Sequence, residues 1–292
     1  MQIGMNLPVM VPGLDRALVR AWCERVDASP LSCLAAGERY HFPNPELTVT
    51  LAAAAAWTER VPLLYNVMIL PLHHEVLAAK QVATLDVLSR GRVRLAVGVG
   101  AREEDFRGLD VSMHGKRLAE VERKVERMKR LWAGEKAFPE ALGPVEPAPY
   151  QGRTPELLAG ALTPASIRRA ARWADGVCGF SFGLAPAELE AQFEGARAAW
   201  REAGRAQPPR LITGCWFALG DDGPARMDAY LRRYLNFFGD AVEFLIPTVP
   251  TVSAAALLEA VARARDAGAD ELILAPTSSD PDEVSRVCDL LF

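Results

Sequence analysis

The chain of 292 residues is poor in the residues that build metal centres and disulfide frameworks. Its five cysteines are scattered and form no Cys-x-x-Cys pair, which disfavours a disulfide framework and a zinc site and fits a reducing cytoplasm. The four histidines include neither a His-x-His nor a His-Glu-x-x-His spacing. We therefore expect no bound metal.

Charged tracts and long apolar runs are also missing. The formal net charge of −4 is spread along the chain, so neither nucleic acid nor an anionic membrane is an expected partner. The start, Met1 to Val11, lacks the basic region and cleavage site of a signal peptide. The most apolar run, Leu51 to Trp57, is too short to cross a bilayer. These features predict a soluble cytoplasmic protein.

Apolar segments of strand length alternate with amphipathic helical segments along the chain. The eight expected strands are 2–8, 31–36, 63–70, 92–99, 156–161, 176–180, 210–219 and 271–275. The expected helices are 15–27, 47–58, 75–89, 115–133, 165–174, 187–203, 253–267 and 282–291. This strict alternation predicts a parallel sheet with helices packed against it.

Eight such units are typical of a closed α/β barrel, the TIM (β/α)8 fold, whereas a doubly wound open sheet usually has about six strands. We therefore expect one barrel domain over residues 1–292. Two segments, about 134–154 and 220–252, interrupt the alternation and are predicted insertions. The second follows a strand, and it should cover a ligand because barrel active sites lie where strands run into helices.

Two glycine-containing turns follow predicted strands. Gly98 and Gly100 lack a Cβ atom, which would let a planar ring or a phosphate approach the backbone. A Rossmann fingerprint would need a third glycine at position 103, where Glu103 stands, so that type of dinucleotide binding is disfavoured. The turn 160–163 precedes Pro164 and opens a helix; its amides would suit a phosphate, although an ordinary capped helix explains the same pattern.

Candidate acid–base groups follow the second, third and fourth predicted strands. They are Glu38, Arg39, His41, His73, His74, Glu103 and Glu104. Each has a purely structural alternative: His74 can simply begin a helix, and the two glutamates at 103 and 104 can be surface charges in the first turn of another.

Longer motifs cover nearly the whole chain. They include Leu70-Pro-Leu-His-His74, Leu77-Ala-Ala-Lys-Gln81, Thr84 to Arg92, Leu95 to Gly100, Glu103 to Gly108, Gly115 to Glu120, and Arg168 to Gly176. Together these motifs closely resemble the bacterial luciferase-like monooxygenase superfamily. The resemblance implies a β/α barrel that binds reduced FMN or the deazaflavin coenzyme F420, commonly as a homodimer. The compact length and the Pro-Leu-His-His run look most like the branch that uses F420.

The resemblance also implies site residues. Glu38 corresponds to an acidic residue near the ring system, and we take Glu38 and His74 as the predicted catalytic residues. Tyr65 and Asn66 correspond to a bulge in the third strand against which the ring rests. The remaining predicted cofactor-binding residues border the ring or match the turn that holds the ribityl phosphate: Gly98, Gly100, Glu104, Gly160, Ala161, Leu162 and Thr163.

Three positions depart from the family pattern. Tyr65 stands where relatives carry a small side chain, and it would narrow the ring site if it points into the barrel. Arg39 and Ala101 stand where some F420-dependent dehydrogenases carry a catalytic histidine and a catalytic glutamate. Dehydrogenation of sugar phosphates by that mechanism is therefore not expected.

Three functions stay open at this point. We favour an F420-dependent oxidoreductase that moves a hydride to or from a small organic substrate. The alternative is an FMN-dependent two-component monooxygenase, which would need a flavin reductase as a partner. The third is a barrel that has lost its cofactor and serves as a binding protein, an idea motivated by Tyr65 and Leu162. The apolar helices around 51–57 and 77–88 additionally predict a homodimer.

Overall fold

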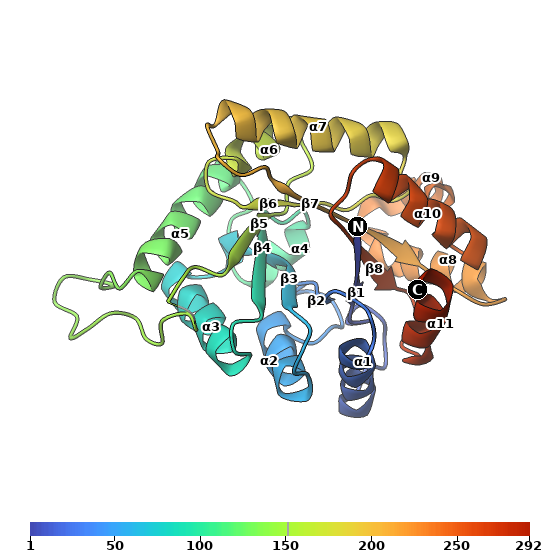
Figure 1. Cartoon of the computed structure of the whole chain (residues 1–292), viewed down its shortest axis with the longest axis horizontal. Helices are drawn as coiled ribbons and strands as arrows, with labels where there is room; N and C mark the ends of the chain where they lie inside the picture. The colour runs from blue at the N-terminus through green and yellow to red at the C-terminus, as the bar shows by residue number, and fades with distance from the viewer. Residues whose placement is uncertain (151) are drawn as a thin grey trace.

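The computed structural model describes residues 1–150 and 152–292, and in it eight parallel strands close into a barrel. Each strand pairs with the next along the chain, and β8 pairs with β1. Figure 1 shows the strands at the centre and the helices in a ring around them. The predicted α/β barrel, with its strict alternation of strands and helices, is therefore confirmed.

All eight predicted strands are present, most of them shorter than predicted because the polypeptide turns away at the rims. Their bounds are β1 (Gln2–Asn6), β2 (Leu34–Ala36), β3 (Leu63–Ile69), β4 (Val93–Gly98), β5 (Glu156–Ala159), β6 (Gly176–Cys178), β7 (Arg210–Phe217) and β8 (Glu271–Pro276). The eight predicted helices are α1 (Arg16–Ala28), α2 (Leu47–Trp57), α3 (Glu75–Leu88), α5 (Arg117–Trp132), α6 (Pro164–Ala170), α7 (Pro186–Glu202), α10 (Ala254–Asp266) and α11 (Asp282–Leu291).

Short helices fill two of the connections at the C-terminal rim. After β3 comes η1 (Leu70–Leu72), and after β4 comes α4 (Glu103–Gly108). The predicted insertion 220–252 contains α8 (Gly223–Tyr234), η2 (Asn236–Ala241), α9 (Val242–Leu245) and η3 (Ile246–Thr248), all between β7 and α10. This insertion therefore lies at the rim where barrel active sites form.

The other predicted insertion, 134–154, connects α5 to β5 on the opposite side of the barrel. Residue 151 lies outside the described residues, and the described part of this connection contains neither helix nor strand. In Figure 1 it is the long green loop that projects away from the barrel. A connection on this side leads into the N-terminal end of a strand, away from the C-terminal rim.

Side chains alternate between two cores because successive residues of a strand point to opposite faces. A large cluster fills the space between strands and helices. The interior of the barrel holds a second, smaller cluster, made of Cys33, Ala35, Leu64, Ala96, Leu158, Cys178, Ile212 and Ile273. Leu64 and Tyr65 are neighbours in β3, yet they belong to different clusters.

Charged residues close the N-terminal end of the barrel. Arg94 Nε donates a hydrogen bond to Glu156 Oε2 at 2.6 Å. Arg94 Nη1 lies 2.8 Å from Glu271 Oε2. Arg210 also donates to Glu271 Oε2, at 2.9 Å, and Ser32 donates to Glu271 Oε1 at 2.6 Å. Burial raises the pKa of Glu271, but the nearby Arg94, Ser32 and Arg210 outweigh burial and leave it below its ordinary value.

Candidate active site

A buried carboxylate and an imidazole meet at the C-terminal ends of β2 and β3. Glu38 Oε1 lies 2.9 Å from His73 Nε2, and Glu38 Oε2 accepts a hydrogen bond from the Ile69 amide at 2.6 Å. The Tyr40 hydroxyl lies 3.1 Å from the same imidazole nitrogen. An ionised Glu38 only accepts, which favours a form of His73 that carries hydrogen on Nε2. The three side chains form a group able to hold and pass a proton.

Burial makes Tyr40 a weaker acid than a free phenol. The Glu38 side chain is 2% exposed and that of His73 is 10% exposed. Burial raises the pKa of Tyr40 well above its ordinary value, and the negative charge of Glu38 adds to the effect. The Tyr40 phenol therefore keeps its hydrogen at neutral pH.

Asp105, in the first turn of α4, fixes the loop that carries these groups. Its Oδ1 accepts hydrogen bonds from the amides of Tyr40 and His41, both at 2.8 Å, and its Oδ2 accepts one from Arg39 Nε at 2.8 Å. The carboxylate is almost fully buried. Asp105 thus holds the loop after β2 against the helix after β4.

Arg39 is buried at the same rim, with a side chain that is 0% exposed. Its Nε bonds Asp105, but neither Nη1 nor Nη2 has a hydrogen-bond partner. Nη2 lies 3.8 Å from Glu104 Oε2, which is an ion-pair distance and too long for a hydrogen bond. Burial lowers the pKa of Arg39, and the charge of Arg102 lowers it further, although Asp105 opposes this.

Glycines at the ends of β4 and β5 leave bare backbone beside the β3 irregularity. The register between β3 and β4 shifts between Tyr65 and Met68, and the peptide bond between Asn66 and Val67 is cis. A Cβ atom on Gly98 would lie 3.0 Å from Val67 Cγ2, and one on Gly160 would lie 3.3 Å from Val67 Cγ1. A side chain at either position would press against Val67, which favours glycine at both.

Gly100 and Asn66 are two further residues that were predicted to border the ring. Gly100 has a φ of +70°, and a Cβ atom there would lie 2.7 Å from Ile69 Cγ2, so glycine is required by the turn itself. The Asn66 side chain points into the barrel, where Nδ2 donates to Asn6 Oδ1 and Oδ1 accepts from Cys178 Sγ, both at 3.3 Å.

Tyr65 does not lie in the barrel interior. It is fully buried in the outer core between strands and helices, with its hydroxyl beside Thr48 of α2. Tyr65 was predicted to narrow the ring site if it points into the barrel, and this condition is not met, because the alternation along β3 turns Leu64 inward and Tyr65 toward the helices. The Tyr65 side chain thus faces away from the barrel interior.

His74 and Glu104 lie apart from the buried proton-holding group. His74 is exposed and caps α3, where it accepts a hydrogen bond from the Val76 amide at 3.3 Å. In this structure it begins a helix, as the structural alternative for it proposed. The neighbouring residue, His73, is the histidine that meets Glu38. The Glu104 side chain is 45% exposed and faces Arg39. His41 is exposed as well.

The turn 160–163 uses most of its own amides. Gly160 donates to Val97 O at 2.8 Å, Ala161 to Ala159 O at 2.9 Å, and Thr163 to Ser166 Oγ at 3.0 Å. Thr163 and Ser166 form a reciprocal capping box at the start of α6. Leu162 is half exposed at the rim. The turn therefore offers a phosphate fewer free donors than the sequence pattern implies, and its role stays a prediction.

Aromatic rings from β7, from the segment after β6 and from the insertion pack against one another. Trp216 lies 4.5 Å from Phe180 and 5.6 Å from Tyr234, measured between ring centroids. Tyr234 stacks on Tyr230 at 5.6 Å with an interplanar angle of 13°. This cluster joins the insertion to the barrel.

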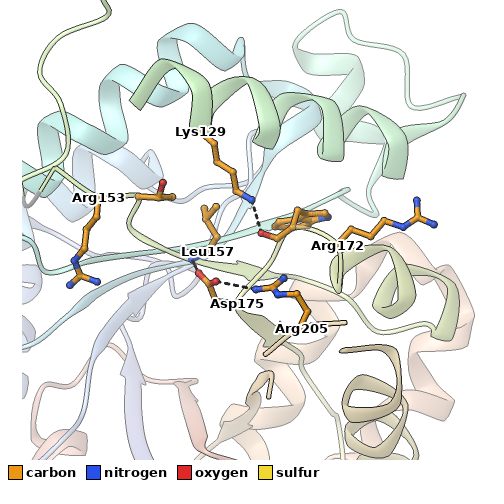
Figure 2. Close-up of a pocket in the computed structure, with 8 residues that line it drawn as sticks. Lys129, Arg153, Leu157, Arg172, Asp175 and Arg205 are labelled. Atoms are coloured by element: carbon orange, nitrogen blue, oxygen red, sulfur yellow. Dashed lines mark hydrogen bonds and ion pairs between the residues drawn. The ribbon is translucent and has the colours of Figure 1, made fainter. Parts of the chain in front are cut away.

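The two larger cavities lie at the other end of the barrel. One of about 610 Å³ is lined by Arg94, Glu156 and Arg210 among others, and one of about 420 Å³ is lined by residues around Leu157 and Asp175. In Figure 2, Arg205 pairs with Asp175, Lys129 reaches the Trp173 carbonyl, and Arg153 and Arg172 point away in opposite directions. These four cationic side chains of the 420 Å³ cavity do not converge on one point, so this cavity lacks the geometry of an anion-binding site.

A third cavity lies beside Gly98 and Gly160. It has a volume of only about 20 Å³ and is bordered by Gly98, Gly160, Ser166 and Arg169. Within the described residues, no group of three or more His, Cys, Asp or Glu side chains could hold a metal ion. Across the same part of the chain, no helix is both long and apolar enough to span a membrane.

Sequence reasoning missed three features of this site. It took His74 where the geometry selects His73, it gave Tyr40 no role, and it did not find Asp105. The first two follow from the direction of η1 and the loop after β2, which no pattern encodes. Asp105 lies in the quoted motif Glu103 to Gly108, but only the closed barrel brings it to Arg39.

Comparison with known proteins identifies the family. The model of the luciferase-like monooxygenase family matches residues 16–287, and the chain belongs to that family. An uncharacterized protein of Mycobacterium tuberculosis is 29% identical over 228 residues, which are 73% of this chain and 74% of that protein. The predicted resemblance is thus confirmed.

Solved structures of enzymes with two different cofactors share the fold. An F420-dependent secondary alcohol dehydrogenase in complex with an F420-acetone adduct has a TM-score of 0.80 and 15% identity, covering 99% of this chain and 98% of that one. The oxygenating constituent of 3,6-diketocamphane monooxygenase of Pseudomonas putida, in complex with FMN, has a TM-score of 0.72 and 19% identity, covering 100% and 96%. At these identities the likeness shows the fold.

Proposed function

We propose that this chain is an F420-dependent oxidoreductase that catalyses hydride transfer to or from a small organic substrate. The observation that carries the proposal is the buried pair of Glu38 and His73 at the C-terminal rim. Oxidation of an alcohol releases a proton together with the hydride, and reduction of a carbonyl consumes one. A hydride enzyme therefore needs a group that takes or gives a proton in a site closed to water.

The rim carries glycines where the resemblance places a flat ring. Gly98 and Gly160 have no side chain at the ends of β4 and β5, and Gly100 follows β4 in a turn with a positive φ. When bound, F420 supplies the hydride chemistry. In this proposal Gly98, Gly100 and Asn66 border the ring, the turn 160–163 holds the phosphate, and the proton passes between the substrate oxygen and the group formed by Glu38, His73 and Tyr40.

An FMN-dependent two-component monooxygenase is the second candidate. The ring cluster of Phe180, Trp216, Tyr230 and Tyr234 favours it, because oxygen chemistry on a flavin also needs a site sheltered from water. The similarity in fold to the FMN complex of 3,6-diketocamphane monooxygenase is compatible with it. A flavin reductase would then be the partner that supplies reduced FMN.

Titration of the purified protein with F420 and, separately, with FMN tests these candidates. The proposal expects saturable binding of F420, followed by bleaching or recovery of its absorbance when alcohols or ketones are supplied. Tighter binding of reduced FMN, with oxygen consumption, would replace it by the second candidate. Binding of neither cofactor would overturn both and support a barrel that acts as a binding protein.

We also propose that the chain forms a homodimer. Helices α2 and α3 expose apolar side chains, with Val49 at 70%, Leu77 at 55% and Leu88 at 64% exposure. Large apolar side chains that face water on neighbouring helices are often covered in an oligomer. Light scattering should give the mass of two chains, and Leu77→Glu should shift the protein toward one. A monomeric mass for the unaltered protein at working concentration contradicts the dimer.

A further inference from the structure

We propose that the substrate carries a carboxylate and that Arg39 binds it. The inference deepens the proposed function, on which its catalytic meaning rests. Its starting point is an imbalance at the rim: the Arg39 side chain is fully buried, yet both of its terminal nitrogens lack hydrogen-bond partners. In the described part of the chain, no other arginine has both Nη atoms buried in this way.

The nearby carboxylates cannot satisfy these nitrogens. Asp105 already accepts from two backbone amides through Oδ1 and from Arg39 Nε through Oδ2. Glu104 remains 3.8 Å from Nη2 and is half exposed to solvent. Buried N–H groups without partners are costly, and an arginine fork is matched in shape by a carboxylate, which accepts two parallel hydrogen bonds. A planar oxyanion is therefore the ligand that this fork selects.

Arg102 adds a second positive charge. The Arg39 guanidinium lies 4.8 Å from the Phe42 ring centroid and 5.9 Å from that of Tyr234, and the Arg102 guanidinium lies 4.5 Å from Tyr234. The positive charge of Arg102 lowers the pKa of Arg39, because the two guanidinium groups repel each other. An anion between the rings and the two guanidinium groups would relieve this repulsion and pack its apolar part on the rings.

The position also suits the proposed reaction. Asp105 accepts hydrogen bonds from Arg39 Nε and from the Tyr40 amide, and the Tyr40 hydroxyl meets His73, so a carboxylate held by Arg39 would lie beside the loop that carries the proton-holding group. Both terminal nitrogens are out of contact with solvent. The ring centroid of Tyr234, at the end of α8, lies 5.9 Å from the Arg39 guanidinium, so the proposal places this ring beside the path of an entering ligand.

Benzoate and its neutral analogue benzamide serve as probes for calorimetric titration of the full chain. Benzoate should bind the unaltered protein at least about tenfold more tightly than benzamide, a difference that corresponds to about 1.4 kcal/mol. Arg39→Met should remove this preference, whereas Arg201→Met, which deletes an exposed arginine of α7, should leave it unchanged. Tyr234→Ala should speed the association of benzoate.

Equal affinity of the unaltered protein for the two probes, or no saturable benzoate binding, overturns the proposal without any variant. If Arg39→Met does not fold by circular dichroism, Arg39→Lys provides the second test. It keeps the charge but loses the fork, and it should weaken benzoate binding at least severalfold.

Titrations repeated in the presence of F420 distinguish the source of the oxyanion. Benzoate binding that persists supports a substrate carboxylate, whereas competition between benzoate and F420 assigns Arg39 to the cofactor and overturns the proposal. A protein that binds benzoate through Arg39 but not F420 would contradict the proposed function alone.

Discussion

Buried arginines occupy both ends of the barrel, and their surroundings differ. At the N-terminal end, Arg94 contacts Glu156 and Glu271 through two of its nitrogens, and only Nη2 lacks a partner. At the C-terminal end, Arg39 makes one hydrogen bond, to Asp105, and both of its terminal nitrogens lack partners. Arg94 is thus paired with two carboxylates, whereas Arg39 is hydrogen-bonded to one and leaves more of its N–H groups without acceptors.

Under the proposed function, the N-terminal end is structural and the C-terminal rim is the functional one. Glu271 is fully buried and forms ion pairs with Arg94 and Arg210 and a hydrogen bond with Ser32. These contacts close the N-terminal end of the barrel. The rim instead combines glycines, a buried acid with its histidine, and an arginine with spare donors. Unmade bonds in a stable scaffold cost stability, and they are retained where a ligand completes them.

The largest expected effect lies at the N-terminal end. Glu271→Ala leaves Arg94 and Arg210 without their shared carboxylate, and breaking a buried pair in this way should cost about 3–5 kcal/mol of the free energy of unfolding. Urea denaturation measures the loss. Glu156→Ala is the matched comparison and should cost less, because its side chain is 27% exposed. Equal losses for the two variants would contradict a dominant role for Glu271.

At the rim, adjacent histidines provide a sharp comparison. His73→Asn should lower kcat about 100-fold because it removes the imidazole that shares a proton with Glu38. His74→Asn should leave kcat nearly unchanged, since His74 is exposed and only caps α3. Turnover with F420 measures both, and cofactor affinity should be the same in the two variants. A larger loss for His74→Asn would restore His74 as the catalytic residue.

Phosphate placement predicts a smaller effect at the same rim. Thr163→Glu puts a carboxylate at the start of α6 and should weaken binding of F420 about tenfold by repulsion of the phosphate. Thr163→Ser keeps the cap and should bind the cofactor normally. Fluorescence titration measures both affinities. Unchanged affinity in a folded Thr163→Glu variant would move the phosphate away from this turn.

Acid should reveal the smallest effect, at the N-terminal end. The pKa of Glu271 is lowered in the folded protein, so its ionised form stabilises the fold above the unfolded value of about 4.3. This contribution is lost as the pH falls through the folded pKa. The free energy of unfolding should therefore decrease more steeply below about pH 4 in the unaltered protein than in Glu271→Gln. Parallel curves from urea titrations at several pH values would show that Glu271 does not contribute.

Much of the architecture was predictable because it depends on local patterns. The eight alternating apolar segments predicted the barrel, and Gly98 and Gly100 were found because they lie at and just after the end of a predicted strand. The direction of Tyr65 was not predicted, because its resemblance-based role ignored the alternation that turns it toward α2. The bulge between Tyr65 and Met68 also changes which side chains face inward after that point.

The sequence by itself determined the closed barrel, the family and the rim at which a site would form, since hydrophobic period, chain order and motifs are local or pairwise properties. Only the tertiary structure decided which polar groups meet. Glu38 and His73 are separated by 35 positions and Arg39 and Asp105 by 66, so their contacts exist only after the strands close. Two adjacent histidines of the same chemistry acquired different surroundings because η1 turns one toward Glu38 and leaves the other at the start of a helix.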